Sequence, residues 1–296
     1  MLTADIPCPI HLEARDLQDE PMLVIDGQAL VIAIGKPQAA KTFGDLADVF
    51  VETVLQSGAQ FQRIDVLFDR YHKHSIKSGT RKRRGRGSVA IRRPVESRDL
   101  PLPAKWQNFI AHEDNKADLA RFISQQLILR APANKTIVAA GGFSDDERVE
   151  ASDSTIDTDS LEAKHEEADT RVVLHCIRSR AASIVVSARD TDILVLLIAY
   201  FHMMPWPKIW MKAGTAKKRK YIPVHAIVEQ LQMEAQVLKL LPSFHALTGS
   251  DSTLYIAGHS KMCWDVFVEH NHLLKGLGEG PELSDHTIWD AEVFFC

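Results

Sequence analysis

The sequence lacks paired cysteines, a long apolar run and a secretory leader. Its four cysteines are scattered and form no Cys-x-x-Cys pair, which argues against a zinc ribbon and a disulfide framework and fits a reducing compartment. The longest apolar run, residues 193–201, is shorter than the roughly eighteen residues of a membrane span. Residues 1–20 are acidic and contain proline, with no basic flank before an apolar stretch, so they do not resemble a secretion signal. We therefore expect an intracellular protein.

Composition is that of an ordinary globular protein. Hydrophobic residues make up 45% of the 296 residues and charged residues 25%, enough to bury a substantial core in one large domain or two small ones. The net charge of -4 conceals a segregation of charge along the chain. Residues 71–93 are rich in lysine, arginine and glycine, whereas residues 144–162 are acidic and almost free of large apolar side chains. We interpret the acidic stretch as a mobile insert.

Short Val- and Ile-rich runs alternate with helical patterns. Five runs without strict polar alternation predict buried strands, namely 22–25, 64–68, 136–140, 184–188 and 208–211. Helical spacing of apolar residues predicts helices at 43–55, 115–129, 166–179, 191–203 and 224–241. This order predicts an α/β fold with three layers, in which helices flank a central and mainly parallel sheet.

The same patterns suggest how the chain is organised. We expect an N-terminal extension at residues 1–20 and one domain at residues 21–270 that carries both charged segments. Residues 271–296 are rich in glycine and acidic residues and end on an apolar stretch. We interpret them as a tail that a longer chain would continue.

Acidic residues fall directly after the predicted strands. Asp26 follows the first strand, Asp69 the second, and Asp190 and Asp192 the fourth. Since the active crevice of an open parallel sheet lies outside the carboxyl ends of its strands, these acids should converge there. More acids stand at the start of a predicted helix, with one further aspartate in a glycine-bearing turn: Glu166, Glu167, Asp169 and Asp251.

Such an acid group suits a hard divalent cation. Oxygen ligands with no Cys or His close by in sequence favour Mg²⁺ or Mn²⁺ over Zn²⁺, and two such ions can hydrolyse a phosphodiester. Each acid also has a simpler interpretation: Asp26 or Asp190 as a helix cap, Glu166 or Glu167 as a complement to a helix dipole, and Asp251 as a turn residue. Their joint order is much harder to obtain by chance than any single position.

That order resembles the flap-endonuclease-like branch of the PIN-like nucleases, which cut branched or flapped DNA. Within this branch the sequence looks most like a group of animal proteins with a connection to mobile elements. The matching motifs, in chain order, are Val24-Ile25-Asp26, Val66-Leu67-Phe68-Asp69, Glu167-Ala168-Asp169-Thr170, Asp190-Thr191-Asp192 and Leu247-Thr248-Gly249-Ser250-Asp251. The resemblance covers roughly residues 23–261. It implies a PIN-like fold, two divalent ions and a metal site made of Asp26, Asp69, Glu167, Asp169, Asp190, Asp192 and Asp251.

The resemblance also gives the basic segment a role. The family has a mobile arch after its second acid, whose basic residues grip the scissile phosphate, and residues 71–93 occupy that place. Lys77 and Arg84 are the implied phosphate contacts. DNA is the implied partner, ahead of RNA, with binding through the backbone that weakens steeply with salt. A nuclear-localisation signal or a solvated basic loop is the alternative interpretation of this segment.

The sequence departs from the family pattern in two places. The third motif normally has two glutamates, whereas Asp169 stands in the second position here, and Glu166 and Glu167 compete for the first. Residues 256–261 are only a weak echo of the element with which the family binds duplex backbone and a monovalent ion. These departures motivate a second hypothesis, a PIN-like module that binds nucleic acid without cutting it.

Other enzymes that use Asp-x-Asp fit less well. A haloacid-dehalogenase-type phosphotransferase needs the pair after the first strand and Thr or Val two residues beyond it, where this chain has Leu194. A topoisomerase-primase-like domain leaves Asp26 and Asp69 unexplained. The sequence therefore favours a metal-dependent nuclease.

Overall fold

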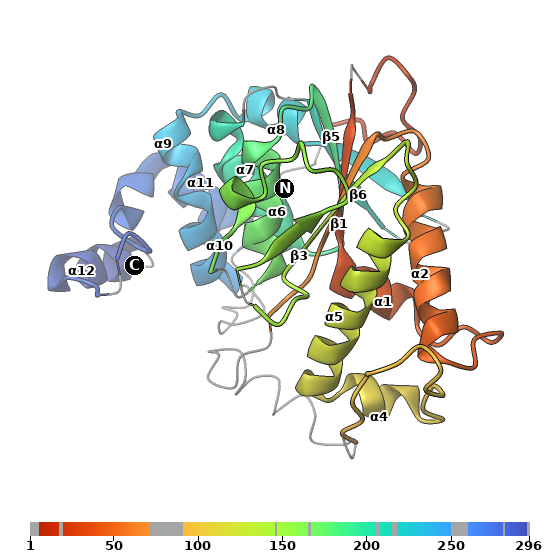
Figure 1. Ribbon diagram of the computed structural model, residues 1–296. Helices are drawn as coiled ribbons and strands as arrows, with labels where there is room; N and C mark the ends of the chain where they lie inside the picture. Colours follow the sequence, from red (N-terminus) through yellow and green to blue (C-terminus); the bar gives the residue numbers. More distant parts are fainter. Residues whose placement is uncertain are drawn as a thin grey trace.

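The structure is a computed structural model that describes residues 6–17, 20–70, 91–145, 147–164, 167–204, 208–214, 218–249, 260–280 and 282–294. Among these residues no helix is long and apolar enough to cross a membrane. The described chain forms a sheet with helices on both faces (Figure 1).

The sheet has seven strands in the order β4-β3-β2-β1-β5-β6-β7. The five inner strands β3, β2, β1, β5 and β6 pair in parallel, and β4 and β7 add antiparallel edges. The strands are β1 (Met22–Asp26), β2 (Arg63–Leu67), β3 (Thr136–Ala140), β4 (Val149–Ala151), β5 (Ser183–Ser187), β6 (Lys208–Ala213) and β7 (Lys220–Pro223).

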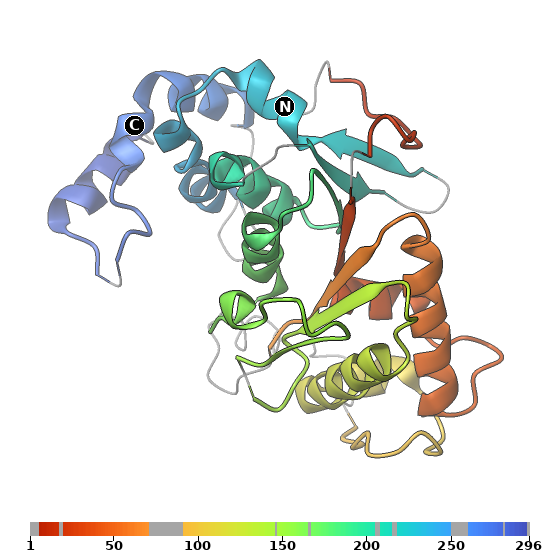
Figure 2. The same cartoon turned by 45° about the horizontal axis from the view of Figure 1, so that its top comes forward.

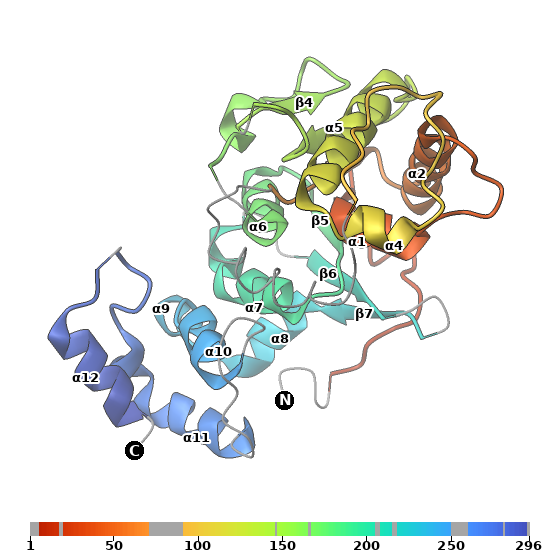
Figure 3. The same cartoon turned by 90° about the horizontal axis from the view of Figure 1, so that it is seen from below.

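Helices cover the two faces in separate groups (Figure 3). One face carries α1 (Gly27–Ile34), α2 (Phe43–Ser57), α4 (Trp106–Ile110) and α5 (Glu113–Leu129). The other face carries α6 (Ala168–Arg178), α7 (Thr191–Ala199) and α8 (Val224–Leu231), with α9 (Ala235–Leu238) and α10 (Leu241–Gly249) beyond α7. The last helices, α11 (Ser260–His270) and α12 (Asp285–Phe294), extend away from the sheet (Figure 2). Three short 3-10 helices complete the described structure: Asp159–Leu161, Phe201–Met203 and Asn271–Leu274.

The inner strands are mainly apolar because both of their faces are covered, and Asp65 in β2 is a fully buried charged exception. Along β1, Met22 and Val24 are buried against the α6 and α7 side, whereas Leu23 and Ile25 are buried against α2 and α5. Successive residues point to opposite faces, so apolar residues are favoured at every position, which explains why the runs show no strict polar alternation. The predicted α/β fold with three layers and a mainly parallel sheet is confirmed.

The chain order of the strands creates a switch point beside β1. From β1 the chain moves to β2 and β3 on one side, and it later returns to place β5 on the other side of β1. The connections after β1 and β5 lead to helices on opposite faces, because α1 belongs to the α2 side and α7 to the α6 side. A crevice opens at the carboxyl ends of the strands where neighbouring connections diverge in this way.

The sequence patterns placed the inner strands correctly and missed the irregular parts. The predicted helix at 224–241 is wrong as one element, since Gln232 adopts a left-handed backbone (φ 49°) that ends α8 before α9 begins. Helix 191–203 is shorter than predicted and continues as a 3-10 turn. The edge strands β4 and β7 were not predicted, and β4 lies inside the acidic stretch that we interpreted as an insert. Our domain limits at residues 20 and 270 stay predictions.

Candidate metal centre

Six of the predicted acids lie where β1, β2 and β5 end and α6 and α7 begin: Asp26, Asp69, Glu167, Asp169, Asp190 and Asp192. Asp190 is exposed and the other five are half-buried. Five of them are coupled electrostatically, as described below, and Asp192 lies beside Asp169 and Asp190. We call these six residues the acid cluster. It stands at the switch point beside β1.

Asp26 and Asp69 are each fixed by a helix start. Asp26 is the last residue of β1 and the N-cap of α1, where its Oδ1 accepts a hydrogen bond from the Ala29 N–H at 2.9 Å. Asp69 follows β2, and its Oδ1 accepts from the Ala168 N–H at 2.9 Å in the first turn of α6. The capping role that we considered for Asp26 is therefore real, and a capping carboxylate retains lone pairs that can bind a cation.

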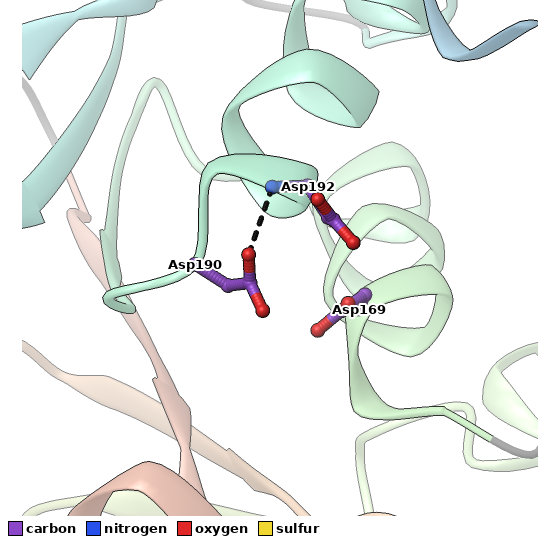
Figure 4. Close-up of side chains that lie close together, drawn as sticks. All are labelled: Asp169, Asp190 and Asp192. Carbon is purple, nitrogen blue, oxygen red and sulfur yellow. Dashed lines mark hydrogen bonds between the residues drawn. The ribbon is translucent and has the colours of Figure 1, made fainter. Parts of the chain in front are cut away.

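Three aspartates of the cluster come closest together. Asp169, Asp190 and Asp192 each offer a carboxylate oxygen, and these oxygens lie within 4.8 Å of one another. Figure 4 shows Asp190 and Asp192 at the start of α7, facing Asp169 at the start of α6. Asp190 caps α7 by accepting a hydrogen bond from the Asp192 N–H at 3.1 Å. Both helix starts thus direct carboxylates to one point.

Burial and mutual repulsion raise the pKa values of two aspartates in the acid cluster. Burial is the main reason that the pKa of Asp169 rises to about 7, and repulsion from Asp190, Asp69, Glu167 and Asp26 adds to it. Burial likewise raises the pKa of Asp26 to about 6, opposed by the hydrogen bond from Ala29 and assisted by the charges of Asp69 and Asp190. Clustered carboxylates hold protons in this way when no cation neutralises them. The donor set therefore fits a hard divalent cation, which prefers oxygen ligands.

His245, which is not one of the acids, contacts Asp192. It belongs to α10, and its Nε2 lies 2.8 Å from Oδ1 of Asp192. A histidine that donates to a carboxylate limits the orientations of that carboxylate, as partners of metal ligands commonly do. The contact with Asp192 needs the packing of α10 on α7, which no local motif reveals.

Basic side chains line a cleft beside Asp26. The cleft has a volume of about 280 Å³ and lies among α1, the end of α2 and the carboxyl ends of β5 and β6. Arg189, Lys212 and Arg219 contribute to its wall together with Asp26. Burial, helped by the charge of Arg219, lowers the pKa of Lys212. Sequence reasoning missed these residues, although Arg189 directly precedes Asp190 and Lys212 lies near the end of a predicted strand.

Three predicted site residues lie outside the described residues: Lys77, Arg84 and Asp251. Glu166 lies outside them as well, whereas Glu167 is close enough to Asp169 for its charge to raise the pKa of that residue. The structure thus brings together six of the seven predicted metal ligands. The metal-binding role of each stays a prediction.

No protein-family model matches this sequence, and no curated protein matches it. Among solved structures, the chain is similar to the bacteriophage T5 D15 flap endonuclease in complex with DNA and metal ions, with a TM-score of 0.47, 12% identity and coverage of 93% of this chain and 86% of that one. It is similar to the T5 5′-exonuclease with bound zinc ions, with a TM-score of 0.48, 12% identity and the same coverages, 93% and 86%. It is also similar to the catalytic core of Rad2 in complex with a DNA substrate, with a TM-score of 0.43, 12% identity and coverage of 97% and 75%.

Proposed function

We propose that this chain is a divalent-metal-dependent nuclease that hydrolyses phosphodiester bonds in DNA. The observation that carries the proposal is the approach of the Asp169, Asp190 and Asp192 oxygens to within 4.8 Å of one another. Such an arrangement of carboxylates costs free energy unless cations are bound, because like charges repel and burial weakens their solvation. An acid cluster at the switch point of a parallel sheet is therefore best explained as a cation site in a substrate crevice.

The acids supply carboxylate oxygens for more than one cation. Asp169, Asp190 and Asp192 form a compact group, and Asp26 and Asp69 are near enough for their charges to raise the pKa of Asp169. This arrangement suits two Mg²⁺ or Mn²⁺ ions, which when bound would activate water and stabilise the leaving oxygen of a phosphodiester. We assign the ligand role, direct or through water, to these five acids together with Glu167 and Asp251.

The protein groups have distinct tasks in this scheme. The capping hydrogen bonds at Asp26 and Asp190 and the Ala168 contact at Asp69 hold carboxylates in place, so that little reorganisation is needed when a cation binds. Raised pKa values at Asp26 and Asp169 mean that these groups release protons on cation binding. Lys77 and Arg84 are proposed to contact the phosphate and offset its charge.

DNA with a flap or branch is the proposed substrate. The motif order of the acids supports this choice, as does the basic segment at 71–93, whose charge is suited to a phosphate backbone. Arg189, Lys212 and Arg219 add positive charge in the cleft that Asp26 also lines. Contacts to the phosphates of the DNA backbone do not depend on the base sequence.

The test is cleavage of labelled 5′-flap, duplex and single-stranded DNA in Mg²⁺, in Mn²⁺ and in EDTA. The Asp190→Asn/Asp192→Asn variant removes two of the three closest carboxylates while asparagine keeps the cap of α7. A matched control exists in the chain, because Asp157-Thr158-Asp159 repeats the tripeptide Asp190-Thr191-Asp192 at an exposed place outside the acid cluster. We expect metal-dependent cleavage that the first variant loses and Asp157→Asn/Asp159→Asn keeps.

Two other results would decide against the proposal. Cleavage that survives in the Asp190→Asn/Asp192→Asn variant would place the activity outside this acid cluster. Salt-sensitive DNA binding with no product in either metal would favour the second hypothesis, a PIN-like module that binds nucleic acid without cutting it.

A further inference from the structure

A buried polar group lies between β2 and α6, away from the acid cluster. Nδ1 of His175 is 2.6 Å from Oδ2 of Asp65, and both side chains are fully buried. Arg63 donates to the same carboxylate through two bonds, from Nε to Oδ1 and from Nη2 to Oδ2, each 2.8 Å long. Its side chain keeps 20% of its surface exposed. The three residues form a network that we call the Asp65 network.

His175 is a donor to Asp65, as Arg63 is. Burial by itself would raise the pKa of Asp65, but the hydrogen bond from His175 and the charge and hydrogen bonds of Arg63 outweigh it and hold that pKa below its ordinary value. An ionised carboxylate only accepts hydrogen bonds, so Nδ1 of His175 carries the hydrogen. The contact is therefore directional and charge-assisted.

The Asp65 network is a second tie between α6 and the segment formed by β2 and Asp69. The first tie is the hydrogen bond from the Ala168 N–H to Asp69, at the acid cluster. The second joins Asp65 to His175, about 10 Å farther along the helix for seven residues at 1.5 Å each. Two directional ties at separate points fix both the position of α6 along β2 and its rotation about its own axis. Glu167 and Asp169 move with this helix start.

Stability alone does not account for a buried ionic group at this place. Val172, Val173 and Cys176 of α6 already pack in the apolar core on this face of the sheet. Replacing a buried ion pair by apolar side chains of similar volume is often neutral or stabilising. Apolar contacts would, however, let the helix settle in more than one position, because they have no direction.

We propose that Asp65 and His175 are positioning residues, which hold α6 so that Glu167 and Asp169 stand opposite Asp69 and Asp190 at the distance a divalent cation requires. The inference rests on the proposed function, since the cation site is what the position of α6 serves. It assigns His175 a task that differs from filling the core. Residues that contact metal ligands directly typically contribute 10- to 100-fold to metal affinity, so for residues that act through α6 we expect an effect at the lower end of this range.

The test compares variants that keep the packing volume and differ in the hydrogen bond. Asp65→Leu/His175→Leu replaces the pair by apolar side chains and leaves Arg63 next to water at the start of β2. His175→Leu keeps the Arg63–Asp65 ion pair and removes only the second donor. His175→Asn offers an N–H donor close to the place of Nδ1. Mn²⁺ affinity by calorimetric titration is measured beside thermal unfolding for the full chain and each variant.

We expect both leucine variants to fold and to bind Mn²⁺ about tenfold more weakly, whereas His175→Asn stays within about threefold of the wild type. Folded leucine variants with unchanged Mn²⁺ affinity would overturn the inference. So would a series in which every variant without the donor fails to fold, because the role would then be structural. A wild-type chain that binds no Mn²⁺ is a different result, which overturns the proposed function and this inference together.

Discussion

Asp69 and Ala168 are joined by a 2.9 Å hydrogen bond although 99 positions separate them in the chain. The bond places the acid after β2 on the first turn of α6, beside Asp169. Asp26 and Asp190 reach the same crevice from the ends of β1 and β5. The acid cluster is therefore held by backbone groups of three helix starts, and this arrangement leads to four predictions.

Cation binding should strengthen as pH rises through about 6 and about 7, the raised pKa values of Asp26 and Asp169. Below these values a proton must leave before a cation binds. For the metal-free chain the sign is opposite: both pKa values lie above the ordinary 3.8, so the folded chain binds protons more tightly than the unfolded chain. Its free energy of unfolding should fall from about pH 4 to about pH 7. Calorimetry across this pH range measures the Mg²⁺ affinity and, without Mg²⁺, the free energy of unfolding. The prediction would be contradicted if both quantities rose, or both fell, with pH.

Asp190→Asn should raise the stability of the metal-free chain while removing its response to metal. The substitution relieves repulsion on Asp169 and Asp26, and asparagine caps α7 as well as aspartate does. We expect a gain of about 1 kcal/mol in the free energy of unfolding near pH 8, the size of one repulsion between partly solvated charges. Thermal unfolding in EDTA and in Mg²⁺ measures both effects. Asp157→Asn is the control, and a loss of stability in EDTA equal in both variants would argue against repulsion.

Gly141→Ala should displace Asp69. Gly141 has a φ of +81°, and a Cβ built on it would lie 2.0 Å from the carbonyl oxygen of Phe68, the residue before Asp69. The substitution should cost more than about 1 kcal/mol of stability and should weaken Mn²⁺ binding as well. Urea unfolding and Mn²⁺ titration measure the two effects. Gly280→Ala is the control, because its Cβ would meet no atom of the described chain within 4 Å and should change neither quantity.

His245→Ala should weaken Mn²⁺ binding about tenfold with little effect on folding. Nε2 of His245 lies 2.8 Å from Asp192, and both side chains are about a quarter exposed, so water can replace the lost partner. His245→Gln retains an amide donor and should recover part of the affinity. Mn²⁺ titration of the three chains tests this, and equal affinity in all of them would show that Asp192 needs no partner.

Sequence reasoning predicted the features that depend on neighbouring residues alone, namely the inner strands and the acids that follow them. An apolar strand buried on both faces reads as an unbroken run, so the five inner strands were predictable, and an acid after each such strand must lie at the same edge of the sheet. Asp26, Asp69 and Asp190 were placed in this way.

Contacts between distant segments were not predictable. His245 meets Asp192 only because α10 packs on α7, and His175 meets Asp65 only because α6 crosses β2. The break at Gln232 has no glycine to announce it, although the backbone of Gln232 is left-handed. Edge strands β4 and β7 are too short to show a period.

The order of the strands has a consequence for how the protein is synthesised. Residues up to β3 emerge from the ribosome first and bring Asp26 and Asp69, whereas Glu167, Asp169, Asp190 and Asp192 follow with the second half of the sheet. An incomplete nascent chain therefore carries only part of the acid cluster. The gene could therefore be split between the codons for β4 and α6, and neither half would hold the whole acid cluster until β5 pairs with β1.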